Sequence, residues 1–387
     1  MVETPFRTVA IVAGICVTHD AISASVRDDA LSLSEPFGFR SRVFTYANEF
    51  ADIDAVVVRD LYGVLFDPFF LSCDLIVYHF GIYYELFNAI FAGNGVAPQV
   101  VRYHNLTPQA LLPASEWRLF ERSSVQLHNL AAADAVWPVS DVNGHELIES
   151  GIVPQERVQM IPLSVGDGRR VTSMTAKSSQ AIQILFVGRF VKSKGLVDLV
   201  QAVARLARQD LAFEARLVGS LRFSDPDFLR MLNRLIGELR LEHCITVVGG
   251  VGDDELEQEY ARAHILAIPS YHEGFCKPVI EAMRHGCVPV TYDASNLKYV
   301  ARGLSRTVRV GDVSALGDAL INLAVDIRGL LRRGDGQSVL VDRGRLELGA
   351  YEAAVDDVLK EYGFPAVSQA LRQSATRLIE TRAALVV

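Results

Sequence analysis

Short apolar runs alternate with helical patterns along most of the chain, and this alternation restricts the fold more than any other feature. Residues 8–16 are a continuous apolar run with β-branched side chains, which is typical of a strand buried on both faces. A helical pattern follows from Asp20. Strands that alternate with helices predict an α/β fold built on doubly wound parallel sheets. The other predicted strands of the first half are residues 43–46, 55–58, 75–78, 100–103, 135–139 and 158–161.

The length of 387 residues is too great for one hydrophobic core and predicts two domains. We place the first domain at residues 1–168. A polar stretch without periodicity, residues 169–180, is the predicted linker. The second domain is then residues 181–362. In the tail, residues 363–387, apolar spacing predicts an amphipathic helix that packs back on the body.

Charge is divided unevenly between the two halves. The net charge is −8, but residues 1–168 hold nine arginines, no lysine and 20 acids, which gives −11, so the remainder carries +3. An acidic first half argues against binding of nucleic acid and against electrostatic attraction to anionic lipid. The mildly basic second half is where we expect an anionic ligand.

Cysteine usage and hydropathy favour a cytoplasmic protein. The N-terminus, MVETPFR, lacks the basic start and apolar core of a secretory signal, and no run of about 18 apolar residues predicts a membrane span. We therefore expect reduced thiols, no metal, and at most a weak peripheral contact with the inner membrane face. The five cysteines are scattered without metal-ligand spacing: Cys16, Cys73, Cys244, Cys276 and Cys287.

Residues 268–289, IPSYHEGFCKPVIEAMRHGCVP, form the most informative stretch. An apolar strand ends at Ile268, and Pro278 is predicted to begin a helix that ends near Gly286. Glu273 then lies in a loop and Glu281 in the first helical turn. The alternative is that Glu281 only complements the helix dipole and that Glu273 is a solvated loop acid. Free backbone N–H groups that could hold a phosphate are predicted at Gly274, Phe275, Cys276 and Lys277.

The window HEGFCKPVIEAMRHGCVPV closely resembles the donor-site motif of retaining glycosyltransferases of family four, the glycosyl transferases group 1. That motif has an acid, Gly-Phe-Gly, a proline and Glu-Ala-Met. Here Cys276 replaces the second glycine, and Lys277 stands where an apolar residue is usual. The resemblance implies a GT-B fold, in which two Rossmann-like domains face each other across a cleft. It assigns residues 1–168 to the acceptor side and residues 181–362 to the nucleotide sugar.

A second segment, VGRFVKSKGLVDL, places Arg189 and Lys194 in a glycine-bounded loop between a strand and a helix. On their own, both are as well explained as surface charges. The resemblance implies that Gly188, Arg189 and Lys194 grip the donor diphosphate, for which arginine is suited by bidentate contact and lysine as a point charge. It also implies that the turn containing Gly250 lies against the nucleobase.

Two histidines follow predicted strands of the first half, His79 in YHFGIYY and His104 in YHNLTP. A structural role is the alternative for each. YHNLTP resembles a family segment whose histidine lies against the donor sugar, which implies that role for His104. The first loop departs from the family, because Gly14 stands alone where a glycine pair is usual.

The resemblance implies transfer of a hexosyl unit from a nucleotide sugar to a hydroxyl of a glycan or lipid-linked acceptor, with retention and without a metal or other cofactor. Arg189, Lys194 and the loop N–H groups would offset charge on the departing diphosphate. Glu273 would bind the sugar and Glu281 the ribose. Likeness to polysaccharide-assembly enzymes suggests GDP-mannose as the donor.

Two alternatives stay open: a non-catalytic GT-B scaffold that binds a nucleotide sugar or a partner enzyme, and a GT-B epimerase that acts on the donor alone. A phosphate-loop ATPase and a dinucleotide dehydrogenase are disfavoured. GRFVKSKG is not a Walker A loop, and Gly-x-Gly-x-x-Gly does not follow the first strand.

Overall fold

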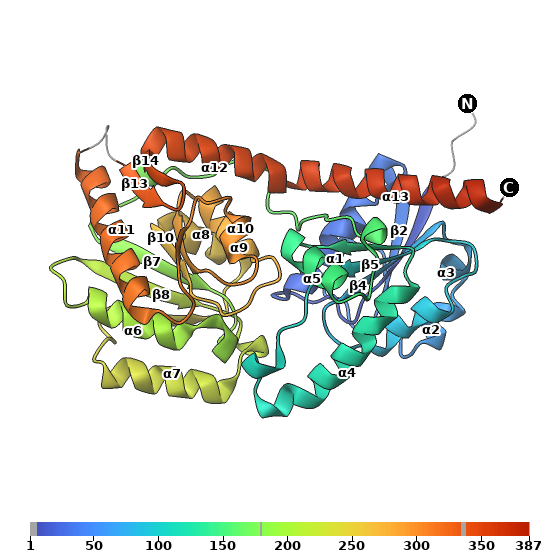
Figure 1. Cartoon of the computed structure of the whole chain (residues 1–387), viewed down its shortest axis with the longest axis horizontal. Coiled ribbons are helices and arrows are strands. Elements are labelled where there is room, and N and C mark those ends of the chain that lie inside the picture. Colours follow the sequence, from blue (N-terminus) through green and yellow to red (C-terminus); the bar gives the residue numbers. More distant parts are fainter. Residues whose placement is uncertain (1–5, 179, 334–337, 387) are drawn as a thin grey trace. The chain divides into compact units, whose positions relative to one another are not determined.

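The computed structural model describes residues 6–178, 180–333 and 338–386, and its chain divides into two compact units (Figure 1). Unit 2 consists of Ala110–Leu112 and Val165–Gly363. Residues 169–180, the predicted linker, therefore lie within it, where Arg170 forms an ion pair with Glu352. Unit 1 consists of Met1–Gln109, Pro113–Ser164 and Phe364–Val387.

Unit 1 is built on a six-stranded parallel sheet of order β3-β2-β1-β4-β5-β6. This is the order of a Rossmann-type doubly wound sheet, in which the direction of winding reverses beside the first strand. The strands are β1 (Arg7–Val12), β2 (Phe39–Thr45), β3 (Ala55–Val57), β4 (Leu75–Phe80), β5 (Gln99–Tyr103) and β6 (Ala135–Pro138). The α-helices are α1 (Ala21–Ser32), α2 (Tyr62–Leu65), α3 (Pro68–Ser72), α4 (Trp117–Leu127), α5 (Asp141–Glu149) and α13 (Phe364–Val386).

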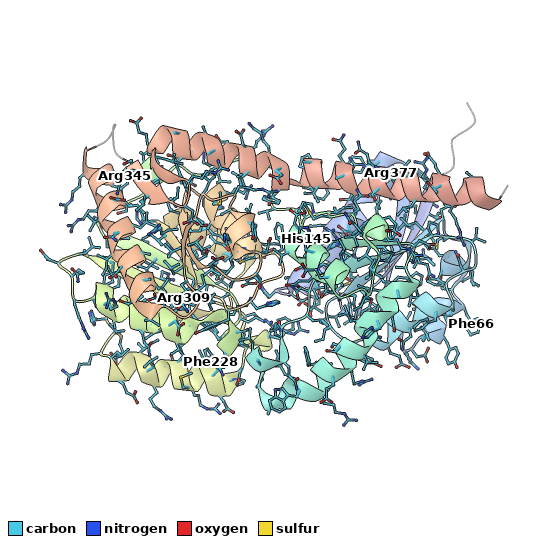
Figure 2. All side chains as sticks on the ribbon, viewed as in Figure 1. Phe66, His145, Phe228, Arg309, Arg345 and Arg377 are labelled. Atoms are coloured by element: carbon cyan, nitrogen blue, oxygen red, sulfur yellow. The ribbon has the colours of Figure 1, made fainter. Side chains whose placement is uncertain are left out.

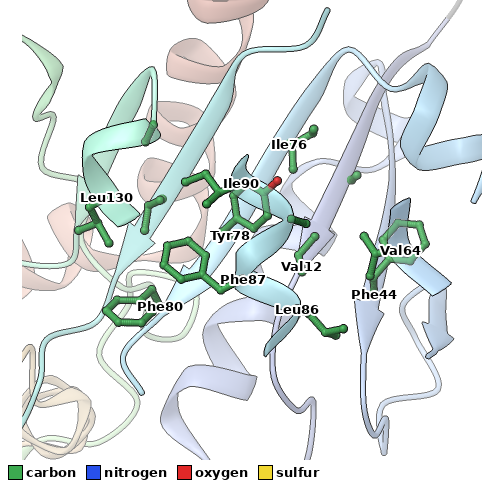
Figure 3. Packing of buried hydrophobic residues seen from close by; sticks show 14 of the residues in the cluster. Val12, Phe44, Val64, Ile76, Tyr78, Phe80, Leu86, Phe87, Ile90 and Leu130 are labelled. Atoms are coloured by element: carbon green, nitrogen blue, oxygen red, sulfur yellow. The ribbon is translucent and has the colours of Figure 1, made fainter. Parts of the chain in front are cut away.

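Both faces of this sheet are buried, which explains why its strands are continuous apolar runs. Successive side chains of a strand point to opposite faces. Val12 and Tyr78 belong to the hydrophobic cluster on one face, which Figure 3 shows. Val9 and Val77 belong to the cluster on the other face. That second cluster also contains Val367, Leu371 and Ala375 of the tail helix α13.

Unit 2 repeats the architecture with a six-stranded parallel sheet of order β12-β11-β10-β7-β8-β9. Its strands are β7 (Ile182–Val187), β8 (Phe213–Val218), β9 (Ile245–Gly249), β10 (Ile265–Ile268), β11 (Val288–Tyr292) and β12 (Arg306–Val308). Its α-helices are α6 (Leu196–Leu206), α7 (Pro226–Glu238), α8 (Asp253–Arg262), α9 (Lys277–Arg284), α10 (Leu297–Val300), α11 (Val313–Arg333) and α12 (Leu348–Tyr362).

Two local predictions are wrong. The sequence predicts one helix over residues 341–362, but residues 341–347 do not begin it, because β13 (Ser338–Val341) and β14 (Gly344–Glu347) form an antiparallel hairpin. Gly344 has φ of 108°, a conformation that glycine tolerates, so the chain turns back here before α12 begins. Residues 158–161 do not form a strand; they contribute one bridge, from Val158 to Val136.

None of the helices among the described residues is long and apolar enough to cross a membrane.

Candidate functional site

The predicted donor residues gather at the carboxyl ends of two neighbouring strands of unit 2. β7 and β10 pair in the middle of the sheet, where the winding direction reverses. In doubly wound sheets, ligands bind outside the carboxyl ends of the strands at this switch point. The loop after β7 carries Gly188, Arg189 and Lys194, and the loop after β10 carries Glu273.

These two loops touch through their backbones. Gly195 has φ of 67°, and a Cβ atom placed on it would lie 1.9 Å from the carbonyl oxygen of Pro269. Only glycine fits such a left-handed position against another backbone. Beside this contact, the Tyr271 N–H donates to the carbonyl of Ser193 at 2.8 Å. The geometry therefore fixes Lys194, which lies between Ser193 and Gly195, next to the β10 loop.

Lys194 and Glu273 form an ion pair, with Nζ 2.7 Å from Oε1. Their side chains are 17% and 12% exposed, so the pair is largely shielded from water. The sequence assigned Lys194 to the diphosphate and Glu273 to the sugar, but did not predict that they contact each other. In this geometry, a diphosphate that binds Lys194 has to compete with the Glu273 carboxylate.

Helix α9 begins one residue earlier than predicted, at Lys277. Its N-cap, Cys276, is buried and has φ of 75° and ψ of 67°, a left-handed conformation that costs a non-glycine residue about 1–2 kcal/mol. The substitution of Cys276 for the usual glycine therefore keeps the backbone path and adds strain. Of the N–H groups of the first turn, Pro278 has none and Val279 donates to Cys276.

Glu281 is the fifth residue of α9, so its predicted place in the first turn is wrong. Its carboxylate accepts a hydrogen bond of 2.7 Å from the Tyr260 hydroxyl of α8. Burial raises the pKa of Glu281 above its usual value, against an opposing effect of Lys277. A carboxylate in such a position needs polar partners, and Tyr260 supplies one of them.

A buried acid, Asp198, connects the loops beside the site through hydrogen bonds. Asp198, in the first turn of α6, accepts hydrogen bonds of 2.6 Å from both Tyr271 and Tyr292. Burial, followed by the bond to Asp198, raises the pKa of Tyr271 to about 12, so this hydroxyl stays protonated and donates. Asn296 holds the β10 loop from a further side by donating to the Phe275 carbonyl at 3.0 Å.

Arg189 and Gly250 lie at the same edge of the sheet, but the structure does not bring them into contact with Lys194 or Glu273. Arg189 is exposed, and among the described residues its guanidinium has no side-chain partner. Gly250 is exposed and follows β9, which is separated from β7 by β8. Their predicted roles toward diphosphate and nucleobase stay predictions.

His79 and His104 of unit 1 contact each other. They lie at the carboxyl ends of β4 and β5, and His79 Nδ1 is 3.0 Å from His104 Nε2. Asp29 of α1, which the sequence did not single out, lies 3.4 Å from His79 Nε2. The sequence position of Asp29 could have indicated a buried acid with a polar partner, because Asp29 shares the apolar helix face of Val26 and Ala30.

Within the described ranges there is no group of three or more His, Cys, Asp or Glu side chains that could hold a metal ion.

Comparison with known proteins shows which family the middle of the chain resembles. The family model for glycosyl transferases group 1 matches residues 173–324. The matched range contains the β7 loop, the β10 loop and α9, which carry the predicted donor residues.

Curated proteins similar to about half of this chain include mannosyltransferases. One is MMP alpha-(1->4)-mannosyltransferase of Mycolicibacterium hassiacum, 31% identical over 200 residues, which are 51% of this chain and 47% of the relative. Another is O-antigen chain mannosyltransferase B of Escherichia coli, 25% identical over 224 residues, 55% of this chain and 57% of the relative. The chain thus spans about half the length of these two relatives.

Solved structures share the fold of the whole chain. Sucrose-phosphate synthase from Thermosynechococcus elongatus has a TM-score of 0.74 at 17% identity and covers 97% of this chain and 100% of its own. Anabaena HepE, solved in complex with UDP-glucose, has a TM-score of 0.69 at 16% identity and covers 96% and 99%. The predicted GT-B fold of two Rossmann-like domains is confirmed.

Proposed function

We propose that the protein is a retaining glycosyltransferase that moves a hexosyl unit from a nucleotide sugar to a hydroxyl group. The observation that carries the proposal is the Lys194–Glu273 pair at the switch point of unit 2, within the residues that match the glycosyl transferases group 1 model. A cation there suits a diphosphate leaving group, and an acid beside it suits the hydroxyls of the attached sugar. An ATPase or a dehydrogenase would not require this combination.

Departure of the diphosphate creates negative charge, and the residues of unit 2 can offset it. Lys194 is held by its ion pair, and Arg189 is exposed at the same edge of the sheet. Backbone N–H groups of Gly274, Phe275, Cys276 and Lys277 precede or begin α9, where the helix dipole favours an anion. Preorganised donors of this kind are each worth about 10²–10³ in rate. We propose that they make a metal unnecessary.

The two acids then have different tasks. We propose that Glu273 binds the sugar, because its partner Lys194 is the predicted diphosphate ligand and the sugar is bonded to that diphosphate. Glu281, held by Tyr260 farther along α9, is assigned to the ribose. In unit 1, His104 is assigned to a substrate hydroxyl. No residue is assigned as general base, since the diphosphate itself can accept the proton of the acceptor hydroxyl.

We propose GDP-mannose as the donor and a glycan or lipid-linked acceptor in polysaccharide or glycoconjugate assembly. Mannosyltransferases among the relatives, one of them named for the O-antigen chain, support this choice. The experiment is a thermal-shift screen of GDP-mannose, GDP, UDP-glucose and UDP. A ligand at ~100 times its dissociation constant adds about 2.7 kcal/mol to the stability. A shift by UDP-glucose and not by GDP-mannose would overturn the choice of donor, and no shift by any of the four would count against the function.

Turnover separates a transferase from the other two candidates. A transferase releases nucleotide diphosphate when a crude acceptor extract is added, whereas an epimerase converts the donor without an acceptor. A binding scaffold does neither. Release should continue in excess EDTA, because side chains and backbone N–H groups offset the charge on the departing diphosphate without a metal. Loss of release in EDTA, restored by a divalent ion, would contradict the metal-free proposal.

Peripheral membrane contact is proposed only as an apolar one. Unit 1 exposes Tyr62 and Phe66, which stack on each other at 5.9 Å and are 66% and 72% exposed (Figure 2 labels Phe66). The acidic first half gives no electrostatic attraction to anionic lipid. Any vesicle binding should therefore survive ~0.5 M salt, which screens charges beyond a few ångströms.

A further inference from the structure

A row of three side chains in unit 1 connects helix α1 to His104. Asp29 Oδ2 lies 3.4 Å from His79 Nε2, and His79 Nδ1 lies 3.0 Å from His104 Nε2. The two imidazole rings stack, with centroids 5.2 Å apart and planes at 22°. Asp29 and His79 are buried, whereas His104 is only half-buried. The row therefore runs from the interior of the unit toward a histidine that is partly exposed.

Burial disfavours the charged form of both imidazole rings. Burial lowers the pKa of His79 well below its usual value, and the neighbouring His104 and Arg102 lower it further. Burial, followed by the charge of Arg102, likewise lowers the pKa of His104 well below its usual value. A neutral imidazole carries one N–H donor and one nitrogen lone pair, so each ring has two possible tautomers, with the hydrogen on Nδ1 or on Nε2.

Asp29 determines the tautomer of His79. The Arg102 guanidinium lies on the same carboxylate, with Nε 3.2 Å from Oδ2, and donates onward to the carbonyls of Ile161 and Pro162. A carboxylate facing a guanidinium only accepts hydrogen bonds. If His79 Nε2 lacked its hydrogen, its lone pair would lie 3.4 Å from the negative carboxylate and be repelled by it, whereas an N–H there is attracted. The hydrogen of His79 is therefore on Nε2, toward Asp29.

The tautomer of His79 in turn determines the tautomer of His104. His79 Nδ1 holds a lone pair, so the short contact with His104 is a hydrogen bond only if His104 Nε2 donates. The hydrogen of His104 is then on Nε2 and its Nδ1 holds a lone pair. No described residue takes a hydrogen bond with that Nδ1.

The residue that follows keeps His104 in place. Asn105 has φ of 82°, which asparagine tolerates better than most residues, and its side chain donates to Asn143 at 2.7 Å. Gly81 packs against His104, because a Cβ atom at Gly81 would lie 3.0 Å from the Cβ of His104. The backbone at His104 is thus held by the loop after β4 and, through Asn105, by α5.

We propose that Asp29 and His79 are positioning residues that hold His104 in its Nε2–H tautomer, so that Nδ1 accepts a hydrogen bond from a substrate hydroxyl. The substrate class, a sugar or acceptor that presents a free hydroxyl, rests on the proposed function; the tautomer does not. An acceptor nitrogen selects a hydroxyl and rejects a fluoro or deoxy analogue at the same carbon, because neither can donate.

The first test is an ¹⁵N–¹H NMR spectrum of the histidine rings in the full chain without substrate, near pH 7.5. The proposal expects His79 and His104 each as a single Nε2–H tautomer. A spectrum in which His104 carries its hydrogen on Nδ1, or averages between both nitrogens, would overturn it. Because no substrate is present, this result does not depend on whether the glycosyltransferase activity is correct.

The second test compares two substitutions at one buried site. His79→Asn keeps an acceptor near the position of Nδ1, whereas His79→Leu removes it. The proposal expects His104 to keep one tautomer in H79N and to lose it in H79L, with kcat/KM of H79L roughly 10-fold below that of H79N. Affinity for free nucleoside diphosphate, assigned to unit 2, should be equal in both. An unchanged His104 tautomer in H79L would overturn the proposal; if H79L does not fold, the spectrum of the parent protein decides alone.

Discussion

Cys276 holds a backbone conformation that its own side chain disfavours. At φ of 75°, an alanine is less stable than a glycine by about 1–2 kcal/mol, the reverse of the order inside a helix. We therefore expect Cys276→Gly to be more stable than Cys276→Ala by about 1 kcal/mol in urea unfolding. Both variants lose the same buried thiol, so the difference between their unfolding free energies reports the backbone effect alone. Equal stabilities would mean that the loop relaxes and that no strain is stored at the donor helix.

Glu273 and Lys194 also make a testable pair at the level of single side chains. Glu273→Gln removes the charge that competes for Lys194, so free nucleoside diphosphate should bind this variant as tightly as the parent or more tightly. Turnover should fall, because contacts to the sugar matter most as the ring distorts toward the transition state. Glu281→Gln is the matched comparison and should weaken diphosphate binding through the ribose. Loss of diphosphate affinity in Glu273→Gln with normal turnover would reverse the assignment.

At the scale of elements, the site depends on how closely the β7 and β10 loops approach. Gly195→Ala would put a methyl group on the Pro269 carbonyl and would hold alanine at φ of 67°. We expect a loss of at least about 1–2 kcal/mol in unfolding free energy from the backbone alone. Gly349→Ala is the control, since a Cβ there meets nothing within 4 Å and lies in a helix. A Gly195→Ala variant as stable as this control would show that the loops do not touch.

Elements with strong patterns could be predicted from the sequence, and weak ones could not. Residues 8–16 form an apolar run because both faces of their sheet are covered, so strand and sheet type could be predicted there. The hairpin of residues 338–347 was missed because two four-residue strands carry too few alternations to stand out from a helix nearby. Motifs located the loops of the site. The Lys194–Glu273 contact and the Asp29–His79–His104 row depend on three-dimensional packing of distant segments, which no local pattern contains.

At the scale of the whole molecule, buried neutral histidines tie stability to pH. Burial lowers the pKa of His79 and His104 well below the usual value and that of His264 to about 4. The unfolded chain, with histidine pKa about 6.5, then binds more protons than the native one. This stability is complete above pH ~6.5 and is lost as pH falls toward the folded pKa, by about 1.4 kcal/mol per pH unit for each histidine. The raised pKa values of Glu281 and Glu146 act in the opposite direction.

Urea unfolding at pH 7.5 and pH 5 measures this effect, and we expect a lower midpoint at pH 5. His264→Gln should reduce the difference, because His264 accepts from the Gln183 N–H at 2.9 Å and glutamine can keep that bond without titrating. Equal midpoints at the two pH values would mean that these rings are not buried as neutral species.

Calorimetric titration with GDP and UDP tests whether the switch point of unit 2 binds a nucleoside diphosphate through Lys194. The parent protein should bind one of the two. Lys194→Ala should weaken that binding by roughly 10- to 100-fold, the effect of losing a hydrogen bond to a charged group. Lys192→Ala, the same charge change at an exposed neighbour, should weaken it by less than about 3-fold. Binding by Lys194→Ala as tight as that of the parent, or a parent that binds neither nucleotide, would contradict the account.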